Sequence, residues 1–317
     1  MKTYFFLGKG GVGKTTLAAS FGIGSSLEDK NVLVVSLDPA HNLGDAFNFT
    51  LSNKIKKISD NLSAVEVDIE KMIKEYLNEL AYKMKNTYRY LTTFNLDRYF
   101  DILRHSPGIE EYAVLEAIKR FIKLKEFDTI VFDTPPTGIT IRVFAMPKLS
   151  LLWTDRLIKM RRKILDRRRM VENVKGKFEA QIEDETVVLT SDEKEDNIMQ
   201  ELIRYRSEME DLRNFFSSDE TTVNVVTMPE ELALFETKRI SESLSEFKIK
   251  LRTIFLNKVI YCKEAPEGIK GKIEEQEEVL KKMREEFKGV EIKEIPLLEH
   301  SPRGIEELEE LYNNYLR

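Results

Sequence analysis

Short runs of apolar residues recur along the chain, and segments with helical spacing separate most of them. The runs have the length of strands, and they lie at residues 3–7, 31–38, 127–134, 222–228, 252–260 and, less regularly, 290–298. An unbroken apolar run of this length is typical of a parallel strand that is buried on both faces. Strands that alternate with helices predict an α/β fold with a mostly parallel, doubly wound sheet.

Two long segments have a different periodicity. In residues 70–125 and 145–215, apolar side chains recur every three or four positions among lysine, arginine and glutamate, which indicates amphipathic helices. We expect these two segments to form a helical subdomain that is inserted into the sheet domain. The predicted sheet domain then consists of residues 1–69, 126–144 and 216–317.

The charge and the cysteine content limit the possible partners. The 317 residues carry a formal net charge of −5, so no global positive field is available to hold nucleic acid. The single cysteine excludes an internal disulfide framework, and it fits the reducing cytoplasm. No run approaches the length of a membrane span, and the first residues lack the pattern of a signal peptide. We therefore expect a cytoplasmic protein that binds no nucleic acid and makes at most peripheral contact with a membrane.

Opposite charges gather in two neighbouring parts of the second helical segment. Residues 156–169 have a local net charge of +7, and eight acidic residues face one lysine in residues 179–196. Two interpretations stay open. The segments can be solvated or paired with each other, or the basic one can contact an anionic membrane surface or a partner protein.

A glycine-rich motif follows the first apolar run directly. It fits the pattern G-x-x-x-x-G-K-[ST] and consists of Gly8, Lys9, Gly10, Gly11, Val12, Gly13, Lys14, Thr15 and Thr16. Between a strand and a helix, such a loop directs its backbone N–H groups at the phosphates of a nucleotide. Lys14 supplies a positive charge to the β and γ phosphates, and the Thr15 hydroxyl suits a Mg²⁺ ligand. The motif predicts a P-loop NTPase.

Lys9 is a second lysine, near the start of this loop. With it, the sequence resembles the deviant P-loop ATPases, which include nitrogenase iron protein, the cell-division-site ATPase and the arsenite-pump ATPase. In that family the early lysine reaches across a two-fold dimer to the nucleotide of the partner. The resemblance implies a homodimer with ATP and Mg²⁺ as cofactors, in which Lys9 and Lys14 stabilise charge during hydrolysis.

The segment after the second apolar run narrows the resemblance to the arsenite-pump and tail-anchored-protein-targeting branch. Residues 38–47, DPAHNLGDAF, are similar to the first switch of that branch, DPAHxLxDxF, with Gly44 where serine is common. The resemblance implies that Asp45 orients or activates the attacking water, although an aspartate here also suits a helix cap. Asp38 ends a strand beside the phosphates, where a carboxylate can order the water around Mg²⁺.

Residues 133–138, DTPPTG, are similar to the second switch of the branch, DTAPTG, with Pro135 in place of alanine. The resemblance implies that Asp133 lies at the Mg²⁺ together with Thr15 and Asp38. It also implies that a short segment couples loss of the γ phosphate to the helices that follow. That segment consists of Pro136, Thr137 and Gly138.

Two later segments are also similar to the branch. In the tripeptide LNK, Asn257 ends a strand at the position of the adenine-recognising asparagine, and its amide can both accept from and donate to a purine. Residues 295–311 are similar to a C-terminal segment of the branch that reads PxxxxEVRG, here with Ser301 and Pro302 in place of Glu-Val. The resemblance implies that Pro296 and Leu297 line the adenine.

The two activities of the branch differ in their need for cysteine. Arsenite-pump ATPases bind As(III) through several thiols, because this soft metalloid prefers sulfur. Many tail-anchored-protein-targeting ATPases clamp their dimer with zinc through a CxxC pair. This sequence has only Cys262, so it resembles an archaeal-type member without the CxxC pair, and we expect no zinc.

The preferred interpretation is a Mg-ATP-dependent homodimeric ATPase that opens and closes a hydrophobic surface for the transmembrane helix of a tail-anchored client. Methionine and leucine suit such a surface because they adapt to varied clients. The candidate groove residues are Phe144, Met146, Leu149, Leu152, Trp153 and Met160, with ordinary packing against the nucleotide domain as the alternative. Two other functions stay open: an ATPase subunit that drives arsenite efflux through a membrane partner protein, and a nucleotide-switched scaffold or chaperone with little turnover.

Overall fold

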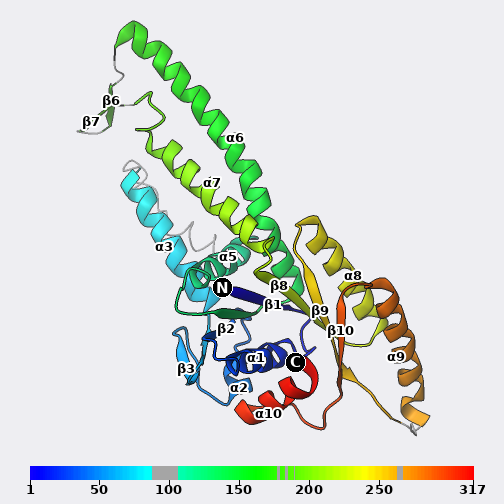
Figure 1. Ribbon diagram of the computed structural model, residues 1–317. Coiled ribbons are helices and arrows are strands. Elements are labelled where there is room, and N and C mark those ends of the chain that lie inside the picture. The colour runs from blue at the N-terminus through cyan, green and yellow to red at the C-terminus, as the bar shows by residue number, and fades with distance from the viewer. Residues whose placement is uncertain (88–105, 177–178, 183–184, 189, 263–266) are drawn as a thin grey trace. The chain divides into compact units, whose positions relative to one another are not determined.

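The computed structural model describes residues 1–87, 106–176, 179–182, 185–188, 190–262 and 267–317. An eight-stranded sheet organises these residues, in the order β10-β9-β8-β1-β5-β2-β4-β3 (Figure 1). All neighbouring strands in it are parallel except β3 and β4. The predicted α/β class and the mostly parallel sheet are therefore confirmed.

Six of the eight strands correspond to the apolar runs in the sequence. The strands are β1 (Lys2–Leu7), β2 (Val32–Ser36), β3 (Lys56–Ser59), β4 (Leu62–Glu66), β5 (Thr129–Asp133), β8 (Thr221–Thr227), β9 (Leu251–Val259) and β10 (Glu291–Pro296). Sequence patterns did not predict β3 and β4, which are short and form the antiparallel edge of the sheet. A two-residue turn joins them, and it brings β4 beside β2.

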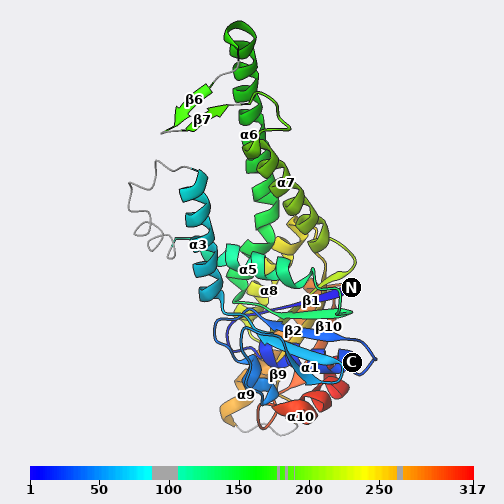
Figure 2. The same ribbon diagram turned by 90° about the vertical axis from the view of Figure 1, so that its left-hand side faces the viewer.

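Helices cover both faces of the sheet, and Figures 1 and 2 show α1 and α10 on one face and α5 on the other. The described helices are α1 (Lys14–Ser26), α2 (Leu43–Phe47), α3 (Ile69–Thr87), α5 (Ile109–Phe121), α6 (Thr137–Lys175), α7 (Asn197–Phe216), α8 (Glu231–Glu246), α9 (Glu267–Glu286) and α10 (Gly304–Leu311), and a π-helical turn, η2 (Tyr312–Leu316), follows α10. None of these helices is both long enough and apolar enough to cross a membrane.

The core of the sheet domain forms because successive side chains of the central strands go to opposite faces. On one face, Phe6 of β1 packs with buried residues of α1, α2 and α10. On the other face, Phe5 stacks on Phe132 of β5, with 4.9 Å between the ring centroids. These contacts fix β1 between β5 and β8, so the carboxyl end of β1 opens at the middle of the sheet edge.

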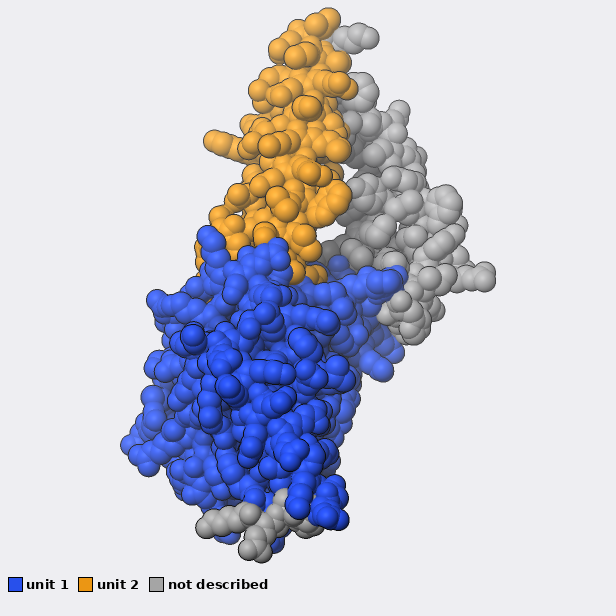
Figure 3. Space-filling model, turned by 90° about the vertical axis from the view of Figure 1, so that its right-hand side faces the viewer, with its two compact units in different colours: residues 1–143, 217–317 blue, residues 144–216 orange. Residues whose placement is uncertain are grey.

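The described residues divide into two compact units, which Figure 3 colours separately. Unit 1 comprises residues 1–143 and 217–317, and unit 2 comprises residues 144–216. The first predicted helical segment, residues 70–125, groups with the sheet in unit 1, and its residues 88–105 lie outside the described part of the chain. The division into a nucleotide-binding domain and a two-part helical subdomain stays a prediction.

Unit 2 is built from the part of α6 that begins at Phe144, from α7 and from a small antiparallel pair of strands, β6 (Glu179–Ile182) and β7 (Glu185–Val188). This hairpin lies in the acidic segment, for which the sequence analysis predicted no strand. Ile158 and Leu165 of α6 are buried with Met199 of α7, which forms the apolar contact between the two helices.

Candidate functional site

The glycine-rich loop lies between β1 and α1, as the motif requires. Gly11 and Gly13 have φ angles of 81° and 97°, which residues with a side chain rarely adopt. A Cβ at Gly13 would lie 2.3 Å from the amide nitrogen of Asn257, and one at Gly8 would lie 2.4 Å from the carbonyl oxygen of Val226. The glycines are therefore needed for the turn itself and for the close approach of the neighbouring strand ends.

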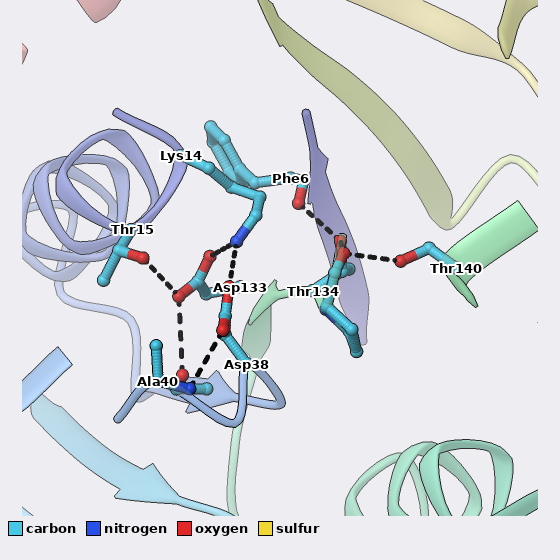
Figure 4. Close-up of polar contacts among 10 residues, drawn as sticks. Phe6, Lys14, Thr15, Asp38, Ala40, Asp133, Thr134 and Thr140 are labelled. Atoms are coloured by element: carbon cyan, nitrogen blue, oxygen red, sulfur yellow. Dashed lines mark hydrogen bonds and ion pairs between the residues drawn. The ribbon is translucent and has the colours of Figure 1, made fainter. Parts of the chain in front are cut away.

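Lys14, the first residue of α1, lies between two carboxylates (Figure 4). Its Nζ is 2.8 Å from Asp38 Oδ2 and 3.0 Å from Asp133 Oδ1. The Thr15 hydroxyl donates to the other oxygen of Asp133, at 2.8 Å. Asp133 ends β5 and Asp38 follows β2, and these strands are parallel neighbours, so the sheet brings the two carboxylates to the same edge.

The charges of this cluster stabilise one another. Burial by itself lowers the pKa of Lys14, but Asp133 and Asp38 outweigh that effect and raise the pKa above its ordinary value. Complete burial raises the pKa of Asp133, against the opposing effects of Lys14 and Thr15. Lys14 is therefore an ammonium group near neutral pH, and it is held in place by the acidic residues that the sequence analysis assigned to Mg²⁺.

A cavity of about 730 Å³ opens above this cluster. That volume is in the range of small-molecule sites. The predicted site residues that line it are Lys9, Gly10, Gly11, Gly13, Lys14, Thr15, Thr16, Asp38, Asp45, Pro136, Asn257, Pro296 and Leu297. The cavity thus brings together residues that are far apart in sequence, with the glycine loop on one side and the segment after β10 on another.

Five of the residues predicted for the nucleotide, the Mg²⁺ and the second switch do not line the cavity. Gly8 and Val12 are buried, and Asp133 is fully buried beneath Lys14 and Thr15. Thr137 and Gly138 form the start of α6. The Thr137 hydroxyl is buried and has no hydrogen-bond partner among the described residues. A buried hydroxyl of this kind is uncommon in proteins.

Asn257 and its neighbour Lys258 hold the glycine loop from the end of β9. The amide nitrogen of Asn257 donates to the carbonyl oxygen of Val12, at 2.8 Å, and the Lys258 ammonium donates to that of Gly11, at 2.9 Å. Lys258 also lines the cavity. Sequence reasoning missed Lys258, although its position directly after Asn257 at the end of a strand was a usable signal.

The first switch segment, residues 38–47, includes the short helix α2, which carries Asp45. Asp45 is exposed and is one of the residues that line the cavity. The backbone N–H of Gly44 donates to Glu66 Oε1, at 2.8 Å, and Glu66 is buried at the end of β4. Sequence reasoning missed Glu66 because no motif marks it.

The second switch segment, residues 133–138, is tied to β1 and to α6. The Thr134 hydroxyl donates to the carbonyl oxygen of Phe6, at 2.8 Å. The Thr140 hydroxyl donates to the carbonyl oxygen of Pro135, at 2.9 Å. The first contact ties the end of β5 to β1, and the second ties it to the first turn of α6 (Figure 4). The second contact spans Pro136, Thr137 and Gly138, the residues predicted to transmit loss of the γ phosphate.

The predicted groove residues lie on α6 in unit 2, and they differ in exposure. Phe144 is buried and packs against Phe216, with 5.0 Å between the ring centroids. Met146 is partly buried. The four others are exposed: Leu149, Leu152, Trp153 and Met160. An apolar surface on α6 therefore starts beyond Phe144.

Part of the basic segment is paired within unit 2. Two hydrogen bonds, of 2.9 and 2.6 Å, join the Arg161 guanidinium to the Asp196 carboxylate, and Arg162 lies 3.2 Å from Glu193. Hydrogen bonding from Arg161 lowers the pKa of Asp196. These contacts agree with the first of the two interpretations of the sequence, in which the basic and acidic segments pair with each other.

No group of three or more histidine, cysteine, aspartate or glutamate residues in the described ranges is arranged to hold a metal ion. Cys262 is exposed. A nucleotide-bound Mg²⁺, as the resemblance implies, would need fewer protein ligands than such a cluster, because Mg²⁺ keeps several waters and binds through one or two carboxylates and the phosphates. The oxygens of Thr15, Asp38 and Asp133 are hard donors of that kind.

Comparisons with known proteins place this site in context. Residues 1–316 match the model of a family described as anion-transporting ATPase. Putative arsenical pump-driving ATPase 2 of Aquifex aeolicus is 30% identical over 315 residues, which cover 98% of this chain and 97% of that protein. ATPase GET3A of Arabidopsis thaliana is 30% identical over 322 residues, which cover 100% of this chain and 84% of that protein. ATPase get3 of Pyrenophora tritici-repentis is 28% identical over 314 residues.

Proposed function

Since the chain belongs to the anion-transporting ATPase family and is an ATP hydrolase, we propose that it works as a Mg-ATP-dependent homodimer that opens and closes an apolar surface for a hydrophobic helix. The observation that carries the proposal is the cluster of Lys14, Asp38 and Asp133 beneath a nucleotide-sized cavity. The family names support ATP hydrolysis in general. The dimer, the client and the residue roles are the proposal.

The triphosphate binds along the glycine loop, with the adenine toward the segment after β10. Asn257 lines that side of the cavity together with Pro296 and Leu297. Lys14 turns from Asp38 and Asp133 to the β and γ phosphates, whose anionic oxygens replace the two carboxylate contacts that it gives up. This exchange frees the two carboxylates.

Thr15, Asp38 and Asp133 would hold the Mg²⁺ or its water shell, and the ion supplies charge neutralisation to the phosphates when it is bound. All three residues lie within one hydrogen-bonded cluster, so the donor set fits. The freedom of Asp38 and Asp133 to take this role depends on Lys14, which binds one oxygen of each carboxylate in the structure.

Hydrolysis is then mainly a matter of position and electrostatics. Asp45 lines the cavity and is exposed, so it can place the water that attacks the γ phosphate, in line with the leaving ADP. Lys9 is also exposed on the cavity wall, and we assign it to the nucleotide of a second copy of the chain. Two subunits that each complete the site of the other explain why ATP would hold a dimer closed.

Release of the γ phosphate reaches the client surface through the start of α6. Pro136 lines the cavity, and Thr137 and Gly138 continue directly into the helix. The Thr137 hydroxyl is buried without a partner among the described residues, which supports a second arrangement of this segment, in which the hydroxyl finds a partner. The exposed residues Leu149, Leu152, Trp153 and Met160 follow on the same helix, and we assign them to a hydrophobic transmembrane-helix client.

Arsenite efflux through a membrane partner is the second candidate, and the printed name of the Aquifex relative supports it. The lone, exposed Cys262 provides one sulfur for a metalloid that prefers several. We therefore rank it below the targeting function.

Co-purification with a transmembrane-helix peptide separates these functions. We expect the peptide to be retained with a non-hydrolysable ATP analogue and lost with Mg-ADP, while arsenite leaves phosphate release unchanged. If the peptide is unbound in both states and arsenite accelerates phosphate release, the efflux function replaces the targeting function. If the peptide is retained but ATP turnover is negligible, the chain is a nucleotide-switched scaffold.

A further inference from the structure

The end of β9 holds the carbonyls of two consecutive peptide units in the glycine loop. The Lys258 ammonium donates to the carbonyl oxygen of Gly11, at 2.9 Å, and the Asn257 amide nitrogen donates to that of Val12, at 2.8 Å. Both carbonyls are therefore turned toward the end of the strand. The resemblance gives a role in nucleotide binding to Asn257 and none to Lys258, although Lys258 also lines the cavity.

The direction of a carbonyl fixes the direction of the N–H group in the same peptide unit. A peptide bond is planar and trans, so its C=O and its N–H point to opposite sides. The N–H groups of Val12 and Gly13 therefore point away from the end of β9. Neither of them donates to a protein acceptor in the described ranges. Adjacent N–H groups of this kind, directly before the N-terminus of a helix, form a concave site for an anion.

The conformation at Gly11 makes this arrangement dependent on Lys258. A Cβ at Gly11 would meet nothing within 4 Å, so no neighbouring atom restrains the loop at that point. Glycine also takes up several backbone conformations at little cost. The peptide unit between Gly11 and Val12 can therefore turn over when nothing holds its carbonyl. A peptide unit that has turned over would direct an oxygen, rather than an N–H group, at the phosphates.

The backbone of Lys258 is constrained for the same contact. Its φ angle of 64° lies in the left-handed region, which is unfavourable for a residue with a side chain. The backbone N–H of Lys258 donates to the side-chain oxygen of Asn257, at 2.9 Å, and this bond stabilises the unfavourable conformation. Lys258 is exposed, and it forms no ion pair with the residues that the structure describes. The carbonyl of Gly11 is therefore the group that fixes its ammonium.

We propose that Lys258 is a positioning residue for the β phosphate of the nucleotide: it holds the carbonyl of Gly11 and so keeps the N–H group of Val12 turned to the phosphate. The inference deepens the proposed function, because it rests on the nucleotide site given there. Lys258 acts through the loop and does not itself contact the phosphates. Its contact should therefore strengthen the binding of ADP and of ATP alike, and leave unchanged the binding of AMP, which has no β phosphate.

Nucleotide affinities of the full-length protein test the proposal. ADP, a non-hydrolysable ATP analogue and AMP each displace a fluorescent ADP analogue, and the dissociation constants are compared between the parent and Lys258→Met. Methionine has an unbranched apolar stem like that of lysine, but it has no group that can donate to Gly11. We expect ADP and the ATP analogue to bind at least about tenfold more weakly to the variant, and AMP to stay within about threefold of the parent.

A second lysine of the chain supplies the matched control. Lys56 is exposed, and its ammonium donates to a loop carbonyl, that of Thr50, at 3.0 Å. Lys56 does not line the cavity. Lys56→Met therefore removes the same kind of charge and the same kind of hydrogen bond away from the phosphates, and it should leave the affinities for all three nucleotides unchanged.

The ratio of the ADP and AMP affinities is the deciding readout, because partial unfolding would lower both affinities by the same factor. An unchanged ratio in Lys258→Met, or an equal change of the ratio in Lys56→Met, would overturn the inference. A greater loss for the ATP analogue than for ADP would also overturn it, since the ammonium would then act on the γ phosphate directly. A parent protein that binds neither ADP nor the ATP analogue would overturn the proposed nucleotide site as well, so the two failures are distinguishable.

Discussion

The backbone amide of Gly44 donates a hydrogen bond of 2.8 Å to the carboxylate of Glu66. Gly44 lies in α2, directly before Asp45, and Glu66 ends β4. A second close approach restricts the same segment, since a Cβ at Gly44 would lie 2.6 Å from the backbone oxygen of Phe49. The position of Asp45 at the cavity therefore depends on the contact between α2 and the end of β4.

Removal of the Glu66 carboxylate should impair turnover more than nucleotide binding. We expect Glu66→Ala to lower kcat about tenfold, because α2 loses its tie to the sheet and Asp45 is no longer held in place. Glu66→Gln is the matched control, since its amide oxygen still accepts from Gly44. Phosphate release measures turnover, and calorimetry measures ATP affinity. If Glu66→Gln lowers kcat as much as Glu66→Ala does, the charge of Glu66 matters rather than its hydrogen bond to Gly44.

Asp45 itself should be needed for the chemical step. Asp45→Asn keeps the size of the side chain but not its ability to activate water, so turnover should fall about 100-fold or more. ATP binding, measured by displacement of a fluorescent analogue, should stay within about twofold because the cradle of glycine amides is unchanged. An unaltered turnover number would remove Asp45 from the mechanism.

The glycine at position 44 should be required for stability. Gly44→Ser places a Cβ 2.6 Å from the backbone oxygen of Phe49, and the resulting strain should reduce the free energy of unfolding by about 1–3 kcal/mol. Gly268→Ala is the control, because a Cβ at that position meets nothing within 4 Å. Urea unfolding of both nucleotide-free variants gives the comparison, and a serine variant as stable as the parent would mean that the loop relaxes freely.

The Arg161–Asp196 pair should make unit 2 sensitive to acid. The pKa of Asp196 is lowered in the folded protein, so the pair stabilises the fold above the ordinary aspartate pKa and this contribution is lost as the pH falls through the folded value. Arg161→Gln should cost about 2 kcal/mol at pH 7, the scale of charged hydrogen bonds. The difference between the variant and the parent should shrink below about pH 4. A difference independent of pH would contradict the role of the Asp196 charge.

The sequence predicted the parts of the fold that depend on local pattern. The buried strands β1, β2, β5, β8 and β9 have continuous apolar runs, and the glycine loop has a motif, so both were visible without the structure. The contacts that position the site residues were not visible in the sequence. Lys258 donates to Gly11 across 247 positions, and Glu66 accepts from Gly44 across 22, so only the folded sheet brings these residues together.

The basic segment, residues 156–169, also combines a feature that the sequence predicts with contacts that depend on the fold. Its charge was evident, but its pairing with Asp196 and Glu193 depends on how α7 returns along α6. The β6–β7 hairpin within the acidic segment was missed because acidic residues are poor strand formers. The burial of Phe144 against Phe216 likewise depends on packing between α6 and α7.

The central claim is that each subunit lends Lys9 to the nucleotide of the other. Lys9→Ala and Asp45→Asn should each be inactive alone, because every site in either homodimer lacks one group. In a mixed dimer, the subunit with intact Asp45 faces a partner with intact Lys9, so one of the two sites is complete. If Lys9 acted on its own nucleotide, neither site of the mixed dimer would be complete.

The decisive measurement is the rate of phosphate release from an equimolar mixture of the Lys9→Ala and Asp45→Asn proteins. Random exchange of subunits gives about half mixed dimers with one complete site each, so we predict about a quarter of the wild-type rate. Sedimentation with ATP confirms that dimers form in the mixture. A mixture that contains dimers and is no faster than either variant alone would contradict the claim.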